Sequence, residues 1–235
     1  MTAPCKLSVI IPAYNETNRL VRTLPTIFAW LDAQGPSELV LVNDGSTDST
    51  LQVMQEAARQ RTYVKVVSYA PNRGKGRAVA EGVAVSLGQQ VLVTDVDLSV
   101  PLEEATRLRE RLQGNVKVAI ASRVATGARV HQPLIRWLGG RGLNLFIQAF
   151  FLPGLKDTQC GFKLFDGATA RTLFAQLHID GFAFDVEVLW RVRRAGLGIA
   201  EVGVEWTHDE DSRVSPLRHT WQILTDLARL RCGLR

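Results

Sequence analysis

Val91-Leu-Val-Thr-Asp-Val-Asp97 joins a short apolar run to two carboxylates that are spaced two residues apart. An apolar run bounded by turn residues is typical of a buried strand, which we place at 91–94. Side chains alternate along an extended chain, so Asp95 and Asp97 are expected on the same face. Two hard oxygen ligands in that position suit a Mg²⁺ ion shared with a diphosphate. A loop with two solvated acids is the alternative, and the neighbouring segments decide between them.

Apolar runs alternate with helical patterns around this stretch, which predicts a parallel α/β sheet with helices on both faces. Ligands of such sheets bind beyond the carboxyl ends of the strands, where polar loops follow here, and this convergence favours a functional role for the aspartates. Pro25 is expected to kink or break the first helix, and Ser46 or Thr47 to cap the second. The expected strands span 7–11, 39–42, 64–69, 91–94, 116–122 and 199–205, and the helices about 20–31, 47–59, 77–87, 102–112 and 182–194.

The composition limits the expected partners. Hydrophobic residues make up 46% and charged residues 22% of the chain, as in ordinary globular proteins. The net charge of +5 favours phosphate-bearing ligands or acidic lipid, whereas nucleic acid is not expected because no basic stripe is interleaved with aromatic residues. Three widely separated cysteines indicate a reducing compartment. Neither a signal peptide nor a transmembrane helix is expected, since the longest uncharged apolar stretch, 142–155, falls short of the roughly 20 residues that span a bilayer.

Three other loops each allow a functional and a purely structural interpretation. Arg73-Gly-Lys-Gly76 lacks the Ser or Thr of a P-loop, so it is either a solvated helix start or a phosphate site at a helix N-terminus. Asp44 precedes a glycine and is either a turn residue or an acceptor for a base N–H. Asp157-Thr-Gln-Cys-Gly-Phe-Lys163 places an acid, an amide and a cation in one turn, which is either a functional loop or a hairpin loop before a short strand.

Together these motifs resemble those of the family-2 glycosyltransferases with the GT-A fold. More narrowly, they resemble the polyprenyl-phosphate hexose synthases, which include dolichyl-phosphate β-glucosyltransferases and dolichol-phosphate mannose synthases. The resemblance covers residues 8 to about 213, and its most specific block, Asp157–Lys163, favours a lipid-phosphate acceptor. The matching stretches are Ser8-Val-Ile-Ile-Pro-Ala-Tyr-Asn-Glu16, Val42-Asn-Asp-Gly-Ser-Thr-Asp48, Asn72-Arg-Gly-Lys-Gly76, Thr94-Asp-Val-Asp97, Asp157-Thr-Gln-Cys-Gly-Phe-Lys-Leu-Phe165 and Phe184-Asp-Val-Glu187.

The resemblance implies a role for each matching residue. The nucleotide-sugar site would consist of Pro12, Tyr14, Glu16, Asp44, Lys75 and Asp95, with Asp44 at the base. Mg²⁺ or Mn²⁺ would be bound by Asp95 and Asp97. The acceptor phosphate would be received by Arg123, Lys163 and Arg213, and the reacting centre would be lined by Asp97, Asp157 and Gln159. One departure concerns Asp211-Ser-Arg213, where relatives usually have Gly-Ser-Lys, because the extra carboxylate weakens a phosphate site.

No break in composition divides the chain, so a single Rossmann-like GT-A domain is expected over residues 1–235. Residues 1–123 would form its nucleotide-binding half, 124–216 its acceptor half and 217–235 an amphipathic C-terminal helix. The apolar segment 134–152 and the basic C-terminus, with five arginines against one aspartate from residue 213 onward, would either pack in the core or lie in a membrane interface. We therefore expect a cytoplasmic protein that is peripheral on the inner face of the membrane.

The function expected from these residues is metal-dependent, inverting transfer of glucose from UDP-glucose to a polyprenyl phosphate. Two enzymatic alternatives stay open: a GDP-mannose donor, or a saccharide acceptor. A nucleotide-sugar-binding protein without turnover is a third, although the paired aspartates argue against it. The sequence leaves the sugar undecided because discrimination among hexoses depends on a few hydrogen bonds.

Overall fold

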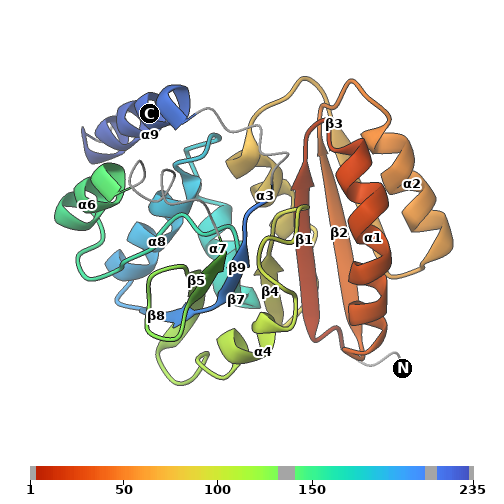
Figure 1. The fold of residues 1–235 in the computed structure, drawn as a ribbon, viewed down its shortest axis with the longest axis horizontal. Coiled ribbons are helices and arrows are strands. Elements are labelled where there is room, and N and C mark those ends of the chain that lie inside the picture. Colours follow the sequence, from red (N-terminus) through yellow and green to blue (C-terminus); the bar gives the residue numbers. More distant parts are fainter. Residues whose placement is uncertain (1–3, 132–140, 210–215, 233–235) are drawn as a thin grey trace.

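A seven-stranded sheet forms the centre of the protein (Figure 1). The computed structural model describes residues 4–131, 141–209 and 216–232. The strands are β1 (Leu7–Ala13), β2 (Ser37–Asp44), β3 (Val64–Tyr69), β4 (Gln90–Val93), β5 (Val116–Ser122), β7 (Lys163–Asp166) and β8 (Gly198–Gly203), and β6 (Arg129–His131) pairs with β9 (Glu205–Thr207) in a small second sheet. The order of the main sheet is β3-β2-β1-β4-β7-β5-β8, and only β7 is antiparallel to its neighbours. The predicted mainly parallel α/β fold is therefore confirmed.

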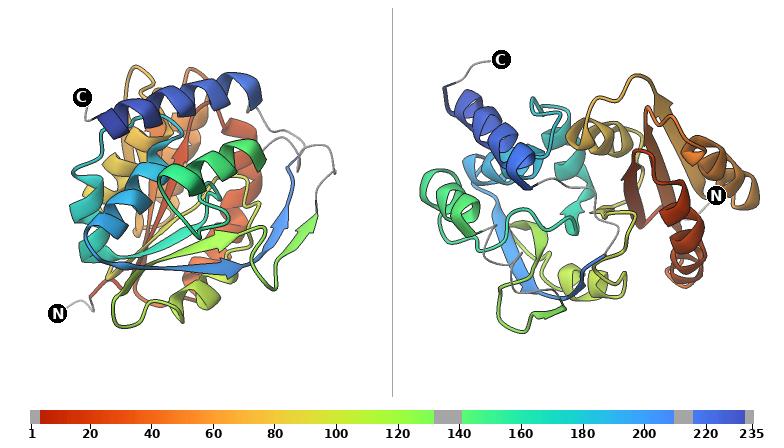
Figure 2. Two further views of the ribbon diagram at one scale, coloured as in Figure 1. Left: turned by 90° about the vertical axis from the view of Figure 1, so that its left-hand side faces the viewer. Right: turned by 45° about the horizontal axis from the view of Figure 1, so that its top comes forward.

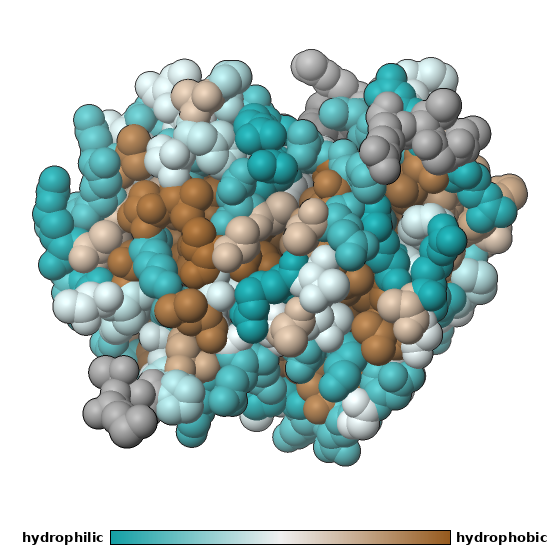
Figure 3. Space-filling view, turned by 180° about the vertical axis from the view of Figure 1, so that it is seen from behind, coloured by the Kyte–Doolittle hydropathy of each residue, from teal (hydrophilic) through white to brown (hydrophobic). Residues whose placement is uncertain are grey.

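Helices cover both faces of the sheet (Figures 1 and 2). One face carries α1 (Thr17–Asp32), α2 (Thr50–Gln60) and α4 (Glu104–Arg109). The other carries α3 (Lys75–Ala84), α6 (Arg141–Phe150), α7 (Gly167–Phe174), α8 (Phe184–Arg194) and α9 (Pro216–Cys232). Seen from behind, hydrophilic residues surround smaller apolar groups on the surface (Figure 3), as is normal for a folded domain.

The central strands are buried on both sides, which explains their continuous apolar sequences. In β1, Val9 and Ile11 belong to the core under α1 and α2, whereas Ile10 belongs to the core under α3. In β4, Leu92 faces the first core and Val91 the second. The alternation confirms the strand predicted at 91–94 to within one residue.

Some local expectations were wrong. Helix α1 continues through Pro25, so the expected break is absent, and a kink at this residue stays a prediction. Helix α2 begins at Thr50 with Ser49 at its N-cap, because Ser46 is engaged elsewhere: its hydroxyl accepts a hydrogen bond from the backbone N–H of Asn15. The sequence patterns also missed α7 and the short pair β6 and β9.

The order in which the chain adds strands to the sheet reverses at β1. The chain proceeds from β1 through β2 to β3 on one side and then returns to β4 on the other side of β1. The carboxyl ends of β1 and β4 thus border the crevice where sheets of this kind bind their ligands. Both the β1 loop and the Asp95–Asp97 stretch begin there.

Candidate active site

A cavity of about 450 Å³ opens at the carboxyl ends of β1, β2 and β4. The cavity brings together residues that are far apart in the sequence, since Pro12, Asp97 and Phe182 all line it. All the residues predicted to bind the nucleotide sugar or the metal line this cavity: Pro12, Tyr14, Glu16, Asp44, Lys75, Asp95 and Asp97. Their convergence is a finding of the structure, while the role of each stays a prediction.

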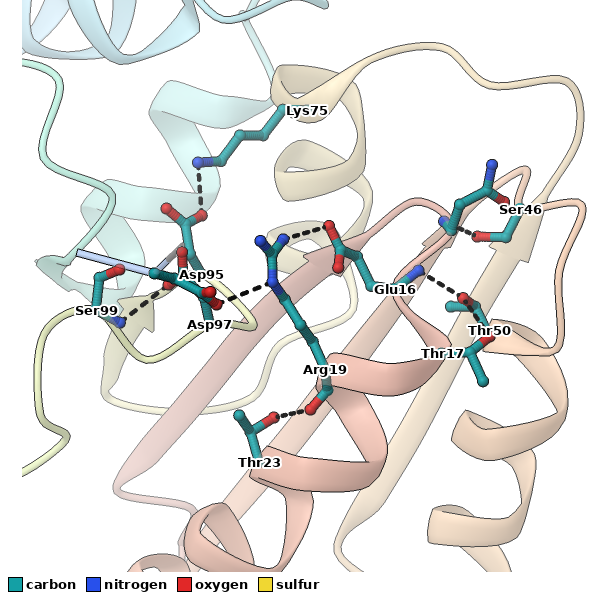
Figure 4. A network of polar contacts seen from close by, with 12 residues as sticks. Glu16, Thr17, Arg19, Thr23, Ser46, Thr50, Lys75, Asp95, Asp97 and Ser99 are labelled. Carbon is teal, nitrogen blue, oxygen red and sulfur yellow. Dashed lines mark hydrogen bonds and ion pairs between the residues drawn. The ribbon is translucent and has the colours of Figure 1, made fainter. Parts of the chain in front are cut away.

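The two aspartates after β4 lie beside the N-terminus of α3 (Figure 4). The Nζ atom of Lys75 is 2.5 Å from Oδ1 of Asp95, and Oδ1 of Asp97 accepts a 2.9 Å hydrogen bond from the backbone N–H of Ser99. Burial raises the pKa of Asp97, and the neighbouring charge of Asp95 raises it further. Burial lowers the pKa of Lys75, but Asp95 and other carboxylates outweigh this effect and keep it above its ordinary value. The ammonium therefore compensates part of the negative charge of the pair.

The donor set at this position fits a divalent cation. Within the described residues, three or more His, Cys, Asp or Glu side chains never gather into a metal cage. Asp95 and Asp97 offer only hard oxygen atoms, which is the chemistry that Mg²⁺ and Mn²⁺ prefer, and such ions commonly complete their coordination with water and substrate phosphates. These two residues would hold the ion.

Asp44 has a structural task that its sequence context only hinted at. Its side chain is 3% exposed, and its carboxylate accepts hydrogen bonds from the Asn72 side chain at 2.8 Å and from the backbone N–H groups of Arg73 at 2.8 Å and Gly74 at 2.9 Å. The turn and ligand interpretations of Asp44 are thus compatible, because a carboxylate that lines the cavity also shapes the loop before α3. A base contact by Asp44 stays a prediction.

Arg19 is a site residue that the sequence reasoning missed. It lies in the first turns of α1, is 8% exposed and lines the cavity. Its Nη1 atom is 2.8 Å from Oε1 of Glu16, and its Nε atom is 3.0 Å from Oδ2 of Asp209. Burial lowers the pKa of Arg19, but Glu16, Asp209 and Asp97 outweigh burial and raise it above its ordinary value. The i,i+3 spacing of Glu16 and Arg19 at a helix start was the available signal.

Arg123, which was predicted to receive the acceptor phosphate, is engaged with Asp157. The guanidinium binds the carboxylate in a bidentate manner, with Nε–Oδ2 at 2.7 Å and Nη2–Oδ1 at 2.8 Å, and the backbone N–H of Arg123 adds a bond of 2.9 Å. Burial raises the pKa of Asp157, but the bonds and charge of Arg123 hold it below its ordinary value. The Arg123 guanidinium also lies 5.6 Å from the ring centre of Trp206.

Lys163 is buried inside the protein. Its side chain is only 3% exposed, and its Nζ atom is 2.7 Å from Oδ1 of Asp185 and 2.5 Å from the carbonyl oxygen of Cys160. This position gives Lys163 an internal role as the partner of Asp185, and direct contact with an acceptor stays a prediction. Gln159 is half-buried in the same block, and Arg213 lies outside the described residues.

The two halves of the site meet at Gly161. A Cβ atom on Gly161 would lie 2.1 Å from Oδ2 of Asp95, so the glycine leaves the space that this carboxylate occupies. The block Asp157–Lys163 therefore carries one residue against the donor-side aspartates and one, Asp157, against Arg123. Its glycine was the sequence signal for this close approach.

Comparison with known proteins gives a consistent result. The family model described as "Glycosyl transferase family 2" matches residues 8–173. The dolichyl-phosphate beta-glucosyltransferase of Dictyostelium discoideum is 33% identical over 242 residues, which is 96% of this chain and 73% of that protein. The human protein of the same name is 31% identical, with 96% and 75% covered.

Solved structures share the fold. Glucosyl-3-phosphoglycerate synthase from Mycobacterium tuberculosis in complex with Mn²⁺ and UDP-glucose has a TM-score of 0.69 at 20% identity and covers 98% of this chain and 80% of its own. Mannosyl-3-phosphoglycerate synthase from Rubrobacter xylanophilus also has a TM-score of 0.69 at 20% identity, with 97% and 75% covered.

Proposed function

The chain belongs to glycosyltransferase family 2, and on that premise we propose that it transfers glucose from UDP-glucose to a polyprenyl phosphate of the dolichyl type. The predicted family, fold class and enzyme class are confirmed. The lipid acceptor and the glucosyl group are supported by the names of relatives that are 31–33% identical over nearly the whole chain.

The observation that carries the proposal is the cavity at the carboxyl ends of β1 and β4, where the strand order reverses. It combines two adjacent carboxylates, a lysine at a helix N-terminus and a buried arginine in one space of about 450 Å³. A nucleoside diphosphate has the complementary chemistry, because its phosphates bind both cations and a metal held by carboxylates.

The reaction requires charge neutralisation more than proton transfer. A divalent cation, when bound at Asp95 and Asp97, supplies stabilisation of the negative charge that develops on the departing diphosphate. Lys75 and the first N–H groups of α3 attract the same phosphates. The attacking phosphate oxygen is anionic near neutral pH, so a strong general base is not required. A single displacement inverts the anomeric centre and gives a β-linked product from an α-linked donor.

Arg123 is the described residue best suited to receive the acceptor phosphate. Its side chain is 34% exposed although Asp157 occupies two of its nitrogen atoms, so further N–H groups are available. Asp157 fixes the guanidinium plane, and a fixed plane favours bidentate binding of a second anion. Lys163, Gln159 and Arg213 complete the proposed acceptor side.

A membrane-facing surface is proposed on α6 and α9, which lie side by side (Figures 1 and 2). Arg231 donates a 3.0 Å hydrogen bond to the carbonyl oxygen of Phe150 and so joins the two helices. Three large apolar side chains are exposed there: Leu145 at 68%, Phe150 at 54% and Trp221 at 72%. None of the helices in residues 4–131, 141–209 and 216–232 is long and apolar enough to cross a bilayer. Insertion at the interface is the mode that exposed apolar residues beside arginines support.

The function is tested by radiolabel transfer into organic-extractable lipid. UDP-glucose and GDP-mannose are supplied separately with Mn²⁺ and a polyprenyl phosphate, and the matched control contains the same polyprenol without phosphate. We expect label in lipid from UDP-glucose alone, none with the polyprenol and none with a chelator. Transfer from GDP-mannose would overturn the donor, and label confined to water-soluble saccharide would overturn the acceptor.

The membrane surface is tested by sedimentation with vesicles that contain anionic lipid. Replacement of Leu145 and Trp221 by Ser should reduce the bound fraction, because each loses apolar area that enters the interface. Leu87→Ser is the matched control, since Leu87 is 66% exposed but belongs to neither α6 nor α9. Equal binding by both variants would remove the proposed surface.

A further inference from the structure

One guanidinium nitrogen in the wall of the cavity has no hydrogen-bond acceptor within the part of the chain that the structure describes. Among residues 4–131, 141–209 and 216–232, Nη2 of Arg19 is buried without a hydrogen-bond acceptor, whereas the Nε and Nη1 atoms of the same guanidinium bind Asp209 and Glu16. A buried donor without a partner costs free energy, and it is more costly when the group is charged. The side chain is nine-tenths buried, so water does not freely satisfy it.

The guanidinium is held in one orientation. Its Nη1 atom is 2.8 Å from Oε1 of Glu16, in the β1 loop, and its Nε atom is 3.0 Å from Oδ2 of Asp209, in the segment after β9. Figure 4 shows the end of Arg19 between Glu16 and the pair Asp95 and Asp97. These two bonds use two of the five N–H groups of the guanidinium. Of the three that remain, two belong to Nη2, on a side chain that lines the cavity.

The carboxylates near Nη2 of Arg19 do not accept a hydrogen bond from it within the described residues. Asp97 acts on Arg19 through its charge, but no hydrogen bond joins the two residues among the described contacts. Asp97 and Asp95 are the proposed metal ligands, so their charge would be shared with a cation when a donor binds. An anion that arrives with this cation is the remaining candidate partner for Nη2.

We infer that Arg19 binds the diphosphate of the donor through Nη2 and is a substrate-binding residue of the transfer reaction. The inference rests on the proposed function and deepens it. The ligand is recognised by its class, a nucleoside diphosphate, because phosphate oxygens bind both a cation held by the aspartates and the guanidinium of Arg19. Binding completes the hydrogen bonds of a guanidinium that Glu16 and Asp209 have already oriented, which lowers the entropy lost on binding.

A purely structural Arg19 would have different consequences. As a bridge between α1 and the segment at Asp209, it would explain Nε and Nη1 and leave Nη2 unexplained. Replacement of Arg19 would then weaken the binding of all ligands of the cavity to the same extent, or would weaken none of them. A diphosphate-binding Arg19 instead affects ligands according to their phosphates.

The experiment compares three ligands by titration in the presence of Mn²⁺: UDP, UMP and uridine, with ligand-observed NMR for the weakest. Arg19→Gln should weaken UDP binding by about 10- to 100-fold, the range for a hydrogen bond to a charged group, and leave uridine within about twofold. Arg19→Lys keeps the charge but loses the fork, and it should weaken UDP binding less. Arg109→Gln is the matched control, because Arg109 is a half-buried arginine whose Nε is 3.0 Å from Oε1 of Gln90, at the opposite end of β4.

Each outcome decides the question. Unchanged UDP affinity in Arg19→Gln, or equal weakening of UDP and uridine, would overturn the role of Arg19. If Arg19→Gln does not fold, Arg19→Lys carries the same comparison. Failure of the wild-type protein to bind UDP would instead overturn the proposed function, so the two failures are distinguishable.

Discussion

The proposed donor and acceptor sides of the site use the same residue types in opposite ways. On the donor side, the Lys75 ammonium pairs with Asp95, and Nη2 of Arg19 has no acceptor within the described residues. On the acceptor side, each predicted cation that the structure describes is matched with a carboxylate. Arg123 pairs with Asp157, and Lys163 pairs with Asp185.

This difference indicates what each side is built to do. Charged groups in a cavity that lack full charge or hydrogen-bond partners favour the binding of a ligand that supplies them. Here we propose that this ligand is a cation together with the phosphates of the donor. Groups that are paired and buried mainly fix the loop that carries them, and their removal is felt as lost stability. Substitutions on the donor side should therefore affect binding and turnover, and those on the acceptor side should affect folding first.

The largest expected effect is on the donor side. Asp97→Asn should reduce glucosyl transfer by more than about 100-fold, because even an outer partner of a metal ligand is worth 10- to 100-fold. The thermal midpoint should stay close to that of the wild type, since the hydrogen bond of Asp97 within the described residues is to Ser99 of its own loop. Transfer is measured by the lipid-extraction assay and stability by thermal denaturation.

The control for Asp97→Asn is Asp32→Asn. Asp32 is an exposed carboxylate that accepts a 2.7 Å hydrogen bond from the hydroxyl of Tyr63, at the far end of α1. It should leave transfer unchanged. Full transfer by Asp97→Asn would contradict the metal role and with it the donor side of the comparison.

The next effect is on the acceptor side and concerns folding. Lys163→Met should lower the free energy of unfolding by about 3–5 kcal/mol, because it leaves the buried carboxylate of Asp185 without its partner. Burial already raises the pKa of Asp185, against the opposing charges of Lys163 and Lys75. Denaturant unfolding measures the loss. Lys156→Met, an exposed lysine of the same region, is the control.

A second substitution tests the cause. Replacing both partners, Lys163→Met with Asp185→Leu, should recover much of the lost stability, because no charge is then left buried alone. If the double variant is as unstable as the single one, the pair does not act as a unit and the acceptor side has another basis.

The sequence predicted the donor side well because its evidence is local. A buried parallel strand has a continuous apolar sequence, and its carboxyl end fixes where the next residues lie. Knowing that Asp95 and Asp97 follow β4 and that Tyr14 follows β1 was enough to bring them to one edge. The boundaries of β3 and β5 were also predicted to the residue.

The acceptor side depends on contacts that no local pattern encodes. Lys163 was expected at the acceptor phosphate, but its partner Asp185 is 22 positions away, on the first turn of α8. Arg19 was missed because its second carboxylate, Asp209, comes from 190 residues later in the chain. Which cations are internally paired is decided by packing between elements, and this is visible only in the fold.

A smaller effect should depend on pH. Asp157→Asn should lower the free energy of unfolding by about 1.5–3 kcal/mol at pH 7, the range for hydrogen bonds to a charged group. The pKa of Asp157 in the folded protein lies below its ordinary value of 3.8, so its stabilisation is present above that value. As the pH falls below 3.8 and through the folded pKa, this contribution is lost.

The difference between wild type and Asp157→Asn should therefore be constant from pH 5 to 8 and narrow below about pH 4. Urea unfolding at several pH values measures it. A difference that persists unchanged into strong acid would mean that the Arg123–Asp157 pair does not contribute through charge.

The smallest effect joins the two sides, because Gly161 belongs to the acceptor block but touches the donor carboxylate. In Gly161→Ala the new Cβ would lie 2.1 Å from Oδ2 of Asp95, and the carboxylate, as the end of a side chain, would swing aside. Mn²⁺ affinity in the presence of UDP should fall by about 10-fold, as for other residues that position metal ligands, with little change in stability.

Gly142→Ala is the control, since a Cβ there meets nothing within 4 Å. Unchanged Mn²⁺ affinity, measured by titration or by the electron paramagnetic resonance of free Mn²⁺, would show that the acceptor block does not shape the donor site. A loss of stability instead would place Gly161 with the paired, structural residues of the acceptor side.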